Sequence, residues 1–190
     1  AFTAVPGVLI KMAGIEPPYM EAAGMACDFV GHPVVSEPQA TKAEIEDFRA
    51  RHDLGDAPVM LVLPGSRRGE VGRLGPIFGN ALGPVLERHP NLRLVVPTTA
   101  HVAPVLRDVV KDWPASPLIL DPSQMKSDVY KAEKACAFGT ATGALAASGT
   151  VSLELAASAT PMVIAYDVSW LSRQIIAMML KIDTLTLVNL

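Results

Sequence analysis

The stretch VMLVLPGSRRGEV at residues 59–71 decides the fold, because an apolar run of strand length breaks there into a turn of glycine, serine and two arginines. An uninterrupted apolar run is typical of a strand buried on both faces, as in parallel sheets covered by helices. A second such run, LRLVVP at 92–97, follows a segment at 77–89 in which apolar residues recur at helical spacing. The stretch therefore predicts the first strand–helix unit of an α/β domain.

The same alternation of strand-length and helix-length segments continues toward the C-terminus. Further strands are expected at 117–120, 144–148, 161–166 and 184–189. The helices between and after them are expected at 101–113, 123–137, 151–159 and 168–181. Crossovers between parallel strands are right-handed, so this order predicts a doubly wound, Rossmann-like parallel sheet.

Residues 1–35 do not follow this alternation. Their Pro17–Pro18 pair and other turn residues are typical of a connecting segment. The segment at 36–55, SEPQATKAEIEDFRARHDLG, has the pattern of a capped helix that leads into the domain. The doubly wound domain is expected over 36–190, and it stops at Leu190 without a helix to cover its last strand. We therefore expect a piece of a longer protein, with 1–35 as a remnant of an N-terminal domain and a truncated C-terminal domain.

Composition narrows the function classes. Half of the residues are hydrophobic and 18% are charged, so the chain can bury a core, and its net charge of −3 argues against nucleic acid as a partner. The mean hydropathy of +0.32 favours contact with a membrane surface, although no apolar run reaches the roughly 20 residues that cross a bilayer. Cys27 and Cys136 lack metal-ligand spacing and are expected to be reduced, apolar residues.

Two polar loops follow expected strands, at the edge where open α/β sheets bind ligands. In the first loop, residues 64–70, Gly65 permits close approach of the backbone and Ser66 can donate a hydrogen bond. Arg67 can bind two oxygens of a phosphate or carboxylate at once. A solvated turn in which Glu70 pairs with an arginine explains the same residues. From the residues alone, both interpretations stay open.

The second loop joins the strand at 144–148 to the helix at 151–159. Ser148 or Thr150 is a plausible cap of this helix, and the hydroxyl groups beside its free N–H groups would attract anions. An ordinary capped helix has the same pattern. Glu154 lies one turn inside this otherwise apolar helix, so it is expected to have a partner, such as a sugar hydroxyl or a base across a cleft. The two loops together favour a nucleotide or a sugar phosphate, but not through a Walker loop or a GxGxxG motif.

The four histidines form no catalytic pattern, because no Ser-His-Asp order is readable. His52, His89 and His101 lie near expected helix ends and are interpreted as surface or capping residues. His32 is open between a turn residue and a residue of the cleft. The helix at 168–181 is likewise open between a core helix and one that lies on lipid.

Five segments occur in an order that matches one family: FVGHPVV at 29–35, LVLPGSRRGEV at 61–71, ASGTVSLELA at 147–156, PMVIAY at 161–166 and TLVNL at 186–190. From about Glu16 onward the chain closely resembles the lipid-A-disaccharide synthases, which are Gram-negative glycosyltransferases. The resemblance implies a two-domain GT-B fold whose C-terminal domain holds most of the UDP-sugar donor. It also implies inverting transfer of 2,3-diacylglucosamine from UDP to 2,3-diacylglucosamine 1-phosphate (lipid X), without a metal ion or another cofactor. The products are the β-1,6-linked disaccharide 1-phosphate and UDP.

The resemblance implies roles for particular residues. The family's PGSR and SGTxxLE segments correspond to the expected donor-binding residues Gly65, Ser66, Arg67, Ser148, Gly149, Thr150 and Glu154. The expected catalytic residues are Arg67, on the donor phosphates, Glu154, and Asn189, which matches the asparagine of the family's terminal LPN segment. Val188 replaces the proline of that segment, and Asp167 replaces a usual arginine. Arg68 is left to face water.

The general base of this family belongs to the N-terminal domain, so we expect the chain alone to carry a donor half-site with little activity. The resemblance further implies a cytoplasmic protein, peripheral on the inner membrane, that acts on UDP-2,3-diacylglucosamine and lipid X. Two alternatives remain: a UDP-N-acetylglucosamine 2-epimerase-like enzyme, and a non-catalytic UDP-sugar-binding module. The sequence indicates no oligomeric state.

Overall fold

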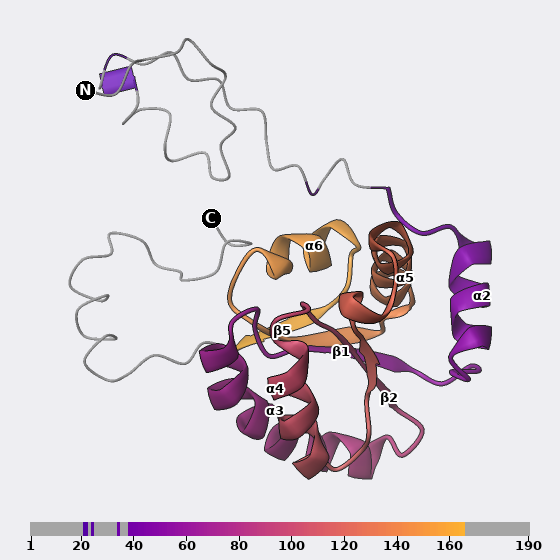
Figure 1. The fold of residues 1–190 in the computed structure, drawn as a ribbon. Coiled ribbons are helices and arrows are strands. Elements are labelled where there is room, and N and C mark those ends of the chain that lie inside the picture. Colours follow the sequence, from indigo (N-terminus) through magenta and orange to yellow (C-terminus); the bar gives the residue numbers. More distant parts are fainter. Residues whose placement is uncertain (1–20, 23, 25–33, 35–37, 166–190) are drawn as a thin grey trace. The chain divides into compact units, whose positions relative to one another are not determined.

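The computed structural model describes residues 21, 22, 24, 34 and 38–165 (Figure 1). Within these residues, one sheet is built from β1 (Val59–Leu63), β2 (Arg93–Pro97), β3 (Leu118–Leu120), β4 (Gly143–Ala147) and β5 (Met162–Ala165). The strands are parallel and lie in the order β3-β2-β1-β4-β5. The predicted parallel α/β sheet is therefore confirmed for this range. The strand expected at 184–189 and the helix expected at 168–181 lie outside the described residues.

The helices follow the predicted order with shifted ends. They are α2 (Lys42–Arg51), α3 (Arg68–Arg88), α4 (Ala103–Val109) with the 3-10 turn η2 (Val110–Asp112), the 3-10 turn η3 (Pro122–Gln124), α5 (Ser127–Thr140) and α6 (Val151–Ala157). The largest difference is at α3, which begins at Arg68, whereas the sequence predicted a start at residue 77. Val71 and Leu74 extend the buried face of the helix N-terminal to Pro76, which lies inside α3. Burial of that face outweighs the hydrogen bond lost at proline.

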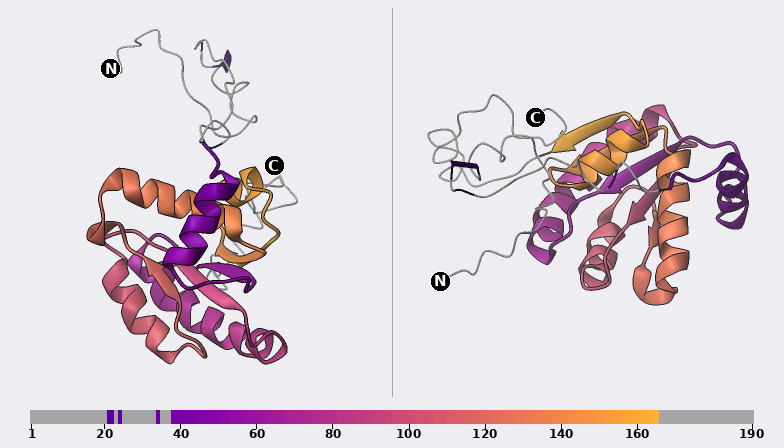
Figure 2. Two further views of the ribbon diagram at one scale, coloured as in Figure 1. Left: turned by 90° about the vertical axis from the view of Figure 1, so that its right-hand side faces the viewer. Right: turned by 90° about the horizontal axis from the view of Figure 1, so that it is seen from above.

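Helices cover both faces of the sheet (Figures 1 and 2). Strand β1 contributes side chains to the hydrophobic cluster on each face. Val59, Leu61 and Leu63 are buried in one cluster together with residues of α2, α5 and α6. Val62 points to the opposite face and is buried in a second cluster with residues of α3 and α4. Because both faces are covered, every position of β1 benefits from an apolar side chain, which is the pattern that the sequence displayed.

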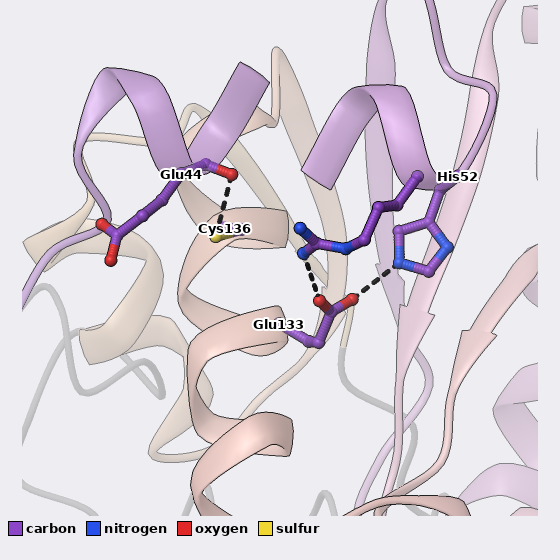
Figure 3. Close-up of polar contacts among 5 residues, drawn as sticks. Glu44, His52, Glu133 and Cys136 are labelled. Carbon is purple, nitrogen blue, oxygen red and sulfur yellow. Dashed lines mark hydrogen bonds and ion pairs between the residues drawn. The ribbon is translucent and has the colours of Figure 1, made fainter. Parts of the chain in front are cut away.

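Helix α2 is not part of the strand–helix alternation, and it packs against α5 (Figure 3). A capped helix was predicted in this region, and α2 begins with a capping box formed by Thr41 and Glu44. At its other end, Glu133 of α5 accepts a hydrogen bond from Arg51 at 2.5 Å and pairs with His52 at 2.6 Å. These contacts attach α2 to α5.

The free thiol of Cys136 is buried between these two helices, and its Sγ lies 3.6 Å from the Glu44 carbonyl oxygen (Figure 3). Burial, together with nearby carboxylates, raises the pKa of this thiol. Cys136 is therefore an apolar residue without thiolate character, as predicted. Cys27 lies outside the described residues.

Candidate functional site

The strand order creates a topological switch point between β1 and β4. The chain runs from β1 outward through β2 to β3, and it then returns to the other side of β1 to form β4 and β5. Open α/β sheets bind ligands beyond the carboxyl ends of the strands at such a point. Leu63 of β1 lies opposite Ala146 of β4 in the register. The two polar loops predicted from the sequence therefore follow neighbouring strands.

The first loop is the turn from β1 into α3, and it is shorter than predicted. Arg67 is the N-cap of α3 and Arg68 to Glu70 form its first turn, so these three residues do not belong to the predicted loop at 64–70. Glu70 accepts a hydrogen bond from the Ser66 backbone N–H at 3.1 Å and one from the Arg67 guanidinium at 2.8 Å. Burial raises the pKa of the Glu70 carboxyl, but the bonds from Arg67 and Ser66 outweigh it and hold this pKa below its ordinary value.

Gly65 makes this tight turn possible. Its φ is +130°, and a Cβ atom at this position would lie 2.7 Å from both Cβ and Oε2 of Glu70. The Arg67 side chain is 80% exposed and uses one terminal nitrogen, Nη1, for Glu70. A guanidinium carries five N–H donors, so the others can bind a second anion. The loop thus contains the ion pair between Glu70 and an arginine that the solvated-turn interpretation predicted. The Arg67 guanidinium and the Ser66 N–H both donate hydrogen bonds to the Glu70 carboxylate.

Arg68 does not simply face water, which corrects the prediction for this residue. Its Nε donates a hydrogen bond to the His101 carbonyl oxygen at 2.9 Å. His101 lies in the loop between β2 and α4, so this bond ties the first turn of α3 to the end of the neighbouring strand unit. The sequence could not indicate the contact, because an arginine at a helix start carries no mark of the loop that it reaches.

The second loop, residues 148–150, begins α6 in a different way from that predicted. Thr150 is the N-cap residue, but its φ of −59° and ψ of −24° are helical and its side chain makes no capping hydrogen bond. A capping hydroxyl needs an extended backbone in order to reach the first N–H groups, so the predicted cap at Thr150 is wrong. Ser152 instead bonds back to the Gly149 carbonyl oxygen through both its hydroxyl, at 2.8 Å, and its N–H, at 3.1 Å.

Glu154 has a basic partner, and it comes from a neighbouring helix. Oε2 of Glu154 forms an ion pair with Nζ of Lys134 on α5, and the two side chains are 23% and 31% exposed. The Lys134 ammonium also lies over the ring of Phe138, 5.4 Å from its centroid. The predicted partnership of Glu154 is thus satisfied within the domain. Lys134 was missed by the sequence analysis, since nothing in its helix marks the acid on α6 as its partner.

Tyr130 lies one turn before Lys134 on α5, and the sequence analysis missed it as well. Its hydroxyl donates a hydrogen bond at 2.6 Å to the carbonyl oxygen of Thr98, the first residue after β2. Burial, and then the negative charges of Glu154 and Asp121, raise the pKa of Tyr130 to about 12. The hydroxyl therefore stays protonated at neutral pH. A spacing of four residues places Tyr130 and Lys134 on one face of the helix. This spacing was the only feature of the sequence that could have indicated that they act together.

The four histidines and Asn189 complete the set of sequence predictions. His52 and His89 lie at the C-caps of α2 and α3, as the predicted positions near helix ends require. His101 is exposed two residues before α4 and lies 3.3 Å from the Thr99 hydroxyl. His32 and Asn189 lie outside the described residues.

A hollow of about 510 Å³ lies at the opposite edge of the sheet, where residues 54–58 lead into β1 and residues 90–93 into β2. It is separate from the switch point, and its lining includes no residue of either polar loop. Among the described residues, no cluster of three or more His, Cys, Asp or Glu side chains could hold a metal ion.

Comparison with known proteins decides the family. A family model described as lipid-A-disaccharide synthetase matches residues 4–190. The chain belongs to the lipid-A-disaccharide synthase family. The lipid-A-disaccharide synthase of Ruegeria pomeroyi is 56% identical over 182 residues, which cover 96% of this chain and 45% of that protein. The one from Rhodospirillum centenum is 43% identical over 183 residues, with 96% of this chain and 43% of that protein covered. The chain thus spans less than half the length of these lipid-A-disaccharide synthases.

Two solved structures share the fold of this lipid-A-disaccharide synthase family member. A glycosyl transferase of family 9 from Veillonella parvula has a TM-score of 0.53 at 11% identity, with 80% of this chain and 49% of that chain covered. A Listeria monocytogenes protein assigned as a UDP-N-acetylglucosamine 2-epimerase has a TM-score of 0.59 at 16% identity, with 88% and 44% covered. At such identities the likeness concerns the fold alone. It confirms the predicted Rossmann-like α/β class.

Proposed function

We propose that this chain is the donor-binding part of a lipid-A-disaccharide synthase, with residues 36–190 as the UDP-sugar domain and 1–35 as the connection to an N-terminal domain. The observation that carries the proposal is the position of the two polar loops at the paired carboxyl ends of β1 and β4, in a chain of this family. The curated relatives are synthases, so a 2-epimerase or a non-catalytic module is not favoured.

The proposed reaction moves a 2,3-diacylglucosaminyl group from UDP to lipid X. The 6-hydroxyl oxygen of lipid X bonds to the anomeric carbon while the bond from that carbon to the diphosphate oxygen breaks. Attack from the face opposite UDP inverts the anomeric configuration and yields the β-1,6 linkage. A base takes the hydroxyl proton, and UDP leaves with the electron pair of the broken bond. This base would come from the part of the protein that precedes the chain.

The residues at the switch point suit the charge that develops on the leaving UDP. Arg67 is exposed, and its guanidinium has N–H groups beyond the one bound to Glu70, so it would bind the diphosphate. Gly65 and Ser66 shape the turn that presents it. At the end of β4 the backbone and hydroxyls of residues 148–150 would contact the nucleotide sugar, and Glu154 would accept a hydrogen bond from one of its hydroxyl groups. Together with Arg67 and Glu154, Asn189 is proposed as a catalytic residue.

The substrates also bear on where the protein works. Both carry acyl chains, so the proposed enzyme would act in the cytoplasm at the surface of the inner membrane. The mean hydropathy of +0.32 is in keeping with such a surface. In the part of the chain that the structure describes, no helix is long and apolar enough to span a bilayer.

The full-length protein that contains this chain provides the test. Formation of radiolabelled disaccharide and binding of UDP would be measured for the wild type, Arg67→Ala and Arg68→Ala. Loss of a charge-assisted contact to phosphate lowers kcat/KM by about 10- to 100-fold in Arg67→Ala. Arg68→Ala removes the same charge one residue away and should cost far less. Full activity of Arg67→Ala would overturn the phosphate-binding role of Arg67. Turnover of both substrates by the isolated chain would overturn the proposal that it carries only the donor half of the active site.

A further inference from the structure

The ion pair between Lys134 and Glu154 joins two helices beside the switch point. Glu154 lies in the first turn of α6, directly after the loop at the end of β4. Lys134 lies in the middle of α5, the helix that leads into β4. Both helices pack on the same face of the sheet, and Leu155 of α6 is buried in one cluster with residues of α5 (Figure 1). The acid of the second loop is therefore held from outside that loop.

The surroundings make this pair more than a transient surface contact. Glu154 is 23% and Lys134 is 31% exposed, whereas Arg67 of the first loop is 80% exposed. Partial burial reduces screening by water and salt, so the attraction is stronger than in an exposed pair. Phe138, one turn further along α5, lies under the ammonium and restricts the positions that it can take. Lys134 is thus itself held in place.

Lys134 occupies only one of the two oxygens of the Glu154 carboxylate. Lys134 contacts Oε2 of Glu154, and no residue in the described part of the chain makes a hydrogen bond to Oε1. A carboxylate oxygen accepts hydrogen bonds and donates none when ionised, so its natural ligand partner is a hydroxyl or an N–H group. The side chain lies on the helix that follows β4, one of the two strands at the switch point. A sugar hydroxyl at this edge is the matching chemistry.

We propose that Lys134 is a positioning residue for donor binding: its ammonium holds Glu154 so that Oε1 faces a hydroxyl group of the nucleotide sugar. The inference rests on the proposed function, because it needs a UDP-sugar at the switch point. Without the ammonium, a half-buried carboxylate loses its partner and turns toward water. The hydroxyl contact would then be lost in the ground state and the transition state alike. The expected signature is a higher KM for the donor with nearly unchanged kcat.

The test uses four variants of the full-length protein: Lys134→Met, Lys134→Arg, Glu154→Gln and the double variant Lys134→Met/Glu154→Gln. Lys134→Met should raise the donor KM by about tenfold, the ratio for one hydrogen bond to a charged group. Lys134→Arg keeps a cation and should restore most of the affinity. The double variant should be no worse than Glu154→Gln, since Lys134 acts only through Glu154. Lys131→Met, an exposed lysine on the same helix, is the matched control and should match the wild type.

Each outcome decides between the inference and the function on which it rests. A wild-type donor KM in Lys134→Met, or an effect of Lys134→Met that adds fully to that of Glu154→Gln, overturns the positioning role. A wild-type donor KM in Glu154→Gln, which keeps an accepting oxygen but removes the charge, shows that the ion pair with Lys134 is not needed for donor binding and likewise overturns the positioning role. Thermal unfolding of each variant shows that it is folded, and a fall in melting temperature without a change in KM assigns Lys134 to structure alone. The Arg67→Ala result is independent of all these and reports on the phosphate site.

Discussion

The loops after β1 and β4 both lead into a helix whose first turn contains an acid, and each acid is paired with a cation. Glu70 is held within its own turn, by Arg67 and the backbone of Ser66. Glu154 is held from another helix, by Lys134. The first loop is therefore shaped by its local sequence, whereas the second depends on how α5 and α6 pack. The two loops should respond differently to the same kinds of substitution.

The largest difference is expected for glycine substitutions. In Gly65→Ala, a Cβ at a φ of +130° would lie 2.7 Å from two atoms of Glu70, so the turn must distort. The free energy of unfolding should fall by about 1–3 kcal/mol. In Gly149→Ala, the new Cβ meets no atom within 4 Å among the described residues, and the change should stay below about 0.5 kcal/mol. Thermal unfolding of the full-length variants measures both, and equal losses would remove the contrast between the loops.

A smaller effect is expected from Glu70→Gln, and it should depend on pH. The folded-state pKa of Glu70 lies below its ordinary value of 4.5, so its ionised form stabilises the folded state. This contribution to stability is fully present above pH 4.5 and disappears as the pH falls through the folded-state pKa. At pH 7 the variant should be less stable than the wild type by under about 1 kcal/mol, because the pair is partly exposed.

The measurement for Glu70→Gln is urea unfolding at a series of pH values. The difference from the wild type should shrink as the pH falls below 4.5. Glu87→Gln, at an exposed position near the end of α3, is the control for simple loss of a carboxylate. A difference that stayed constant down to pH 3 would show that Glu70 acts through its shape and not through its charge.

The smallest effect concerns salt. Double-mutant cycles would measure the coupling between Arg67 and Glu70 and that between Lys134 and Glu154, at low and at molar salt. Arg67 is 80% exposed, so its coupling should fall toward zero, while the more buried Lys134 pair should keep most of its coupling. The expected change is a few tenths of a kcal/mol. Equal salt sensitivity of the two pairs would mean that burial does not distinguish them.

The same division between local and distant partners explains which predictions succeeded. The capping box of Thr41 and Glu44 was readable because both residues lie within one turn. The start of α3 was missed because the burial of Val71 and Leu74 depends on the sheet beneath them, which their sequence alone does not show. Thr150 occupies the N-cap position of α6, but its side chain makes no capping hydrogen bond because its backbone is helical, a conformation that the residue type does not reveal.

The candidate site divides in the same way. Gly65, Ser66 and Arg67 were predicted to lie in a turn after a strand, and they do follow β1, because the strand and the turn are adjacent in the chain. Glu154 was expected to have a partner, but the partner was not identifiable. Tyr130 and Lys134 reach the site only because the right-handed crossover from β3 to β4 lays α5 beside α6.

By itself, the sequence determined the parallel α/β class, the strands around VMLVLP, the two polar loops and the family. Each of these depends on residues close together in the chain: apolar runs that need burial on both faces, and turns that need glycine. The tertiary structure alone decided that β1 and β4 are neighbours, that Arg68 binds the carbonyl of His101, and that Lys134 neutralises Glu154. These contacts join distant segments, and their energies depend on burial and charge proximity that exist only once the layers have packed.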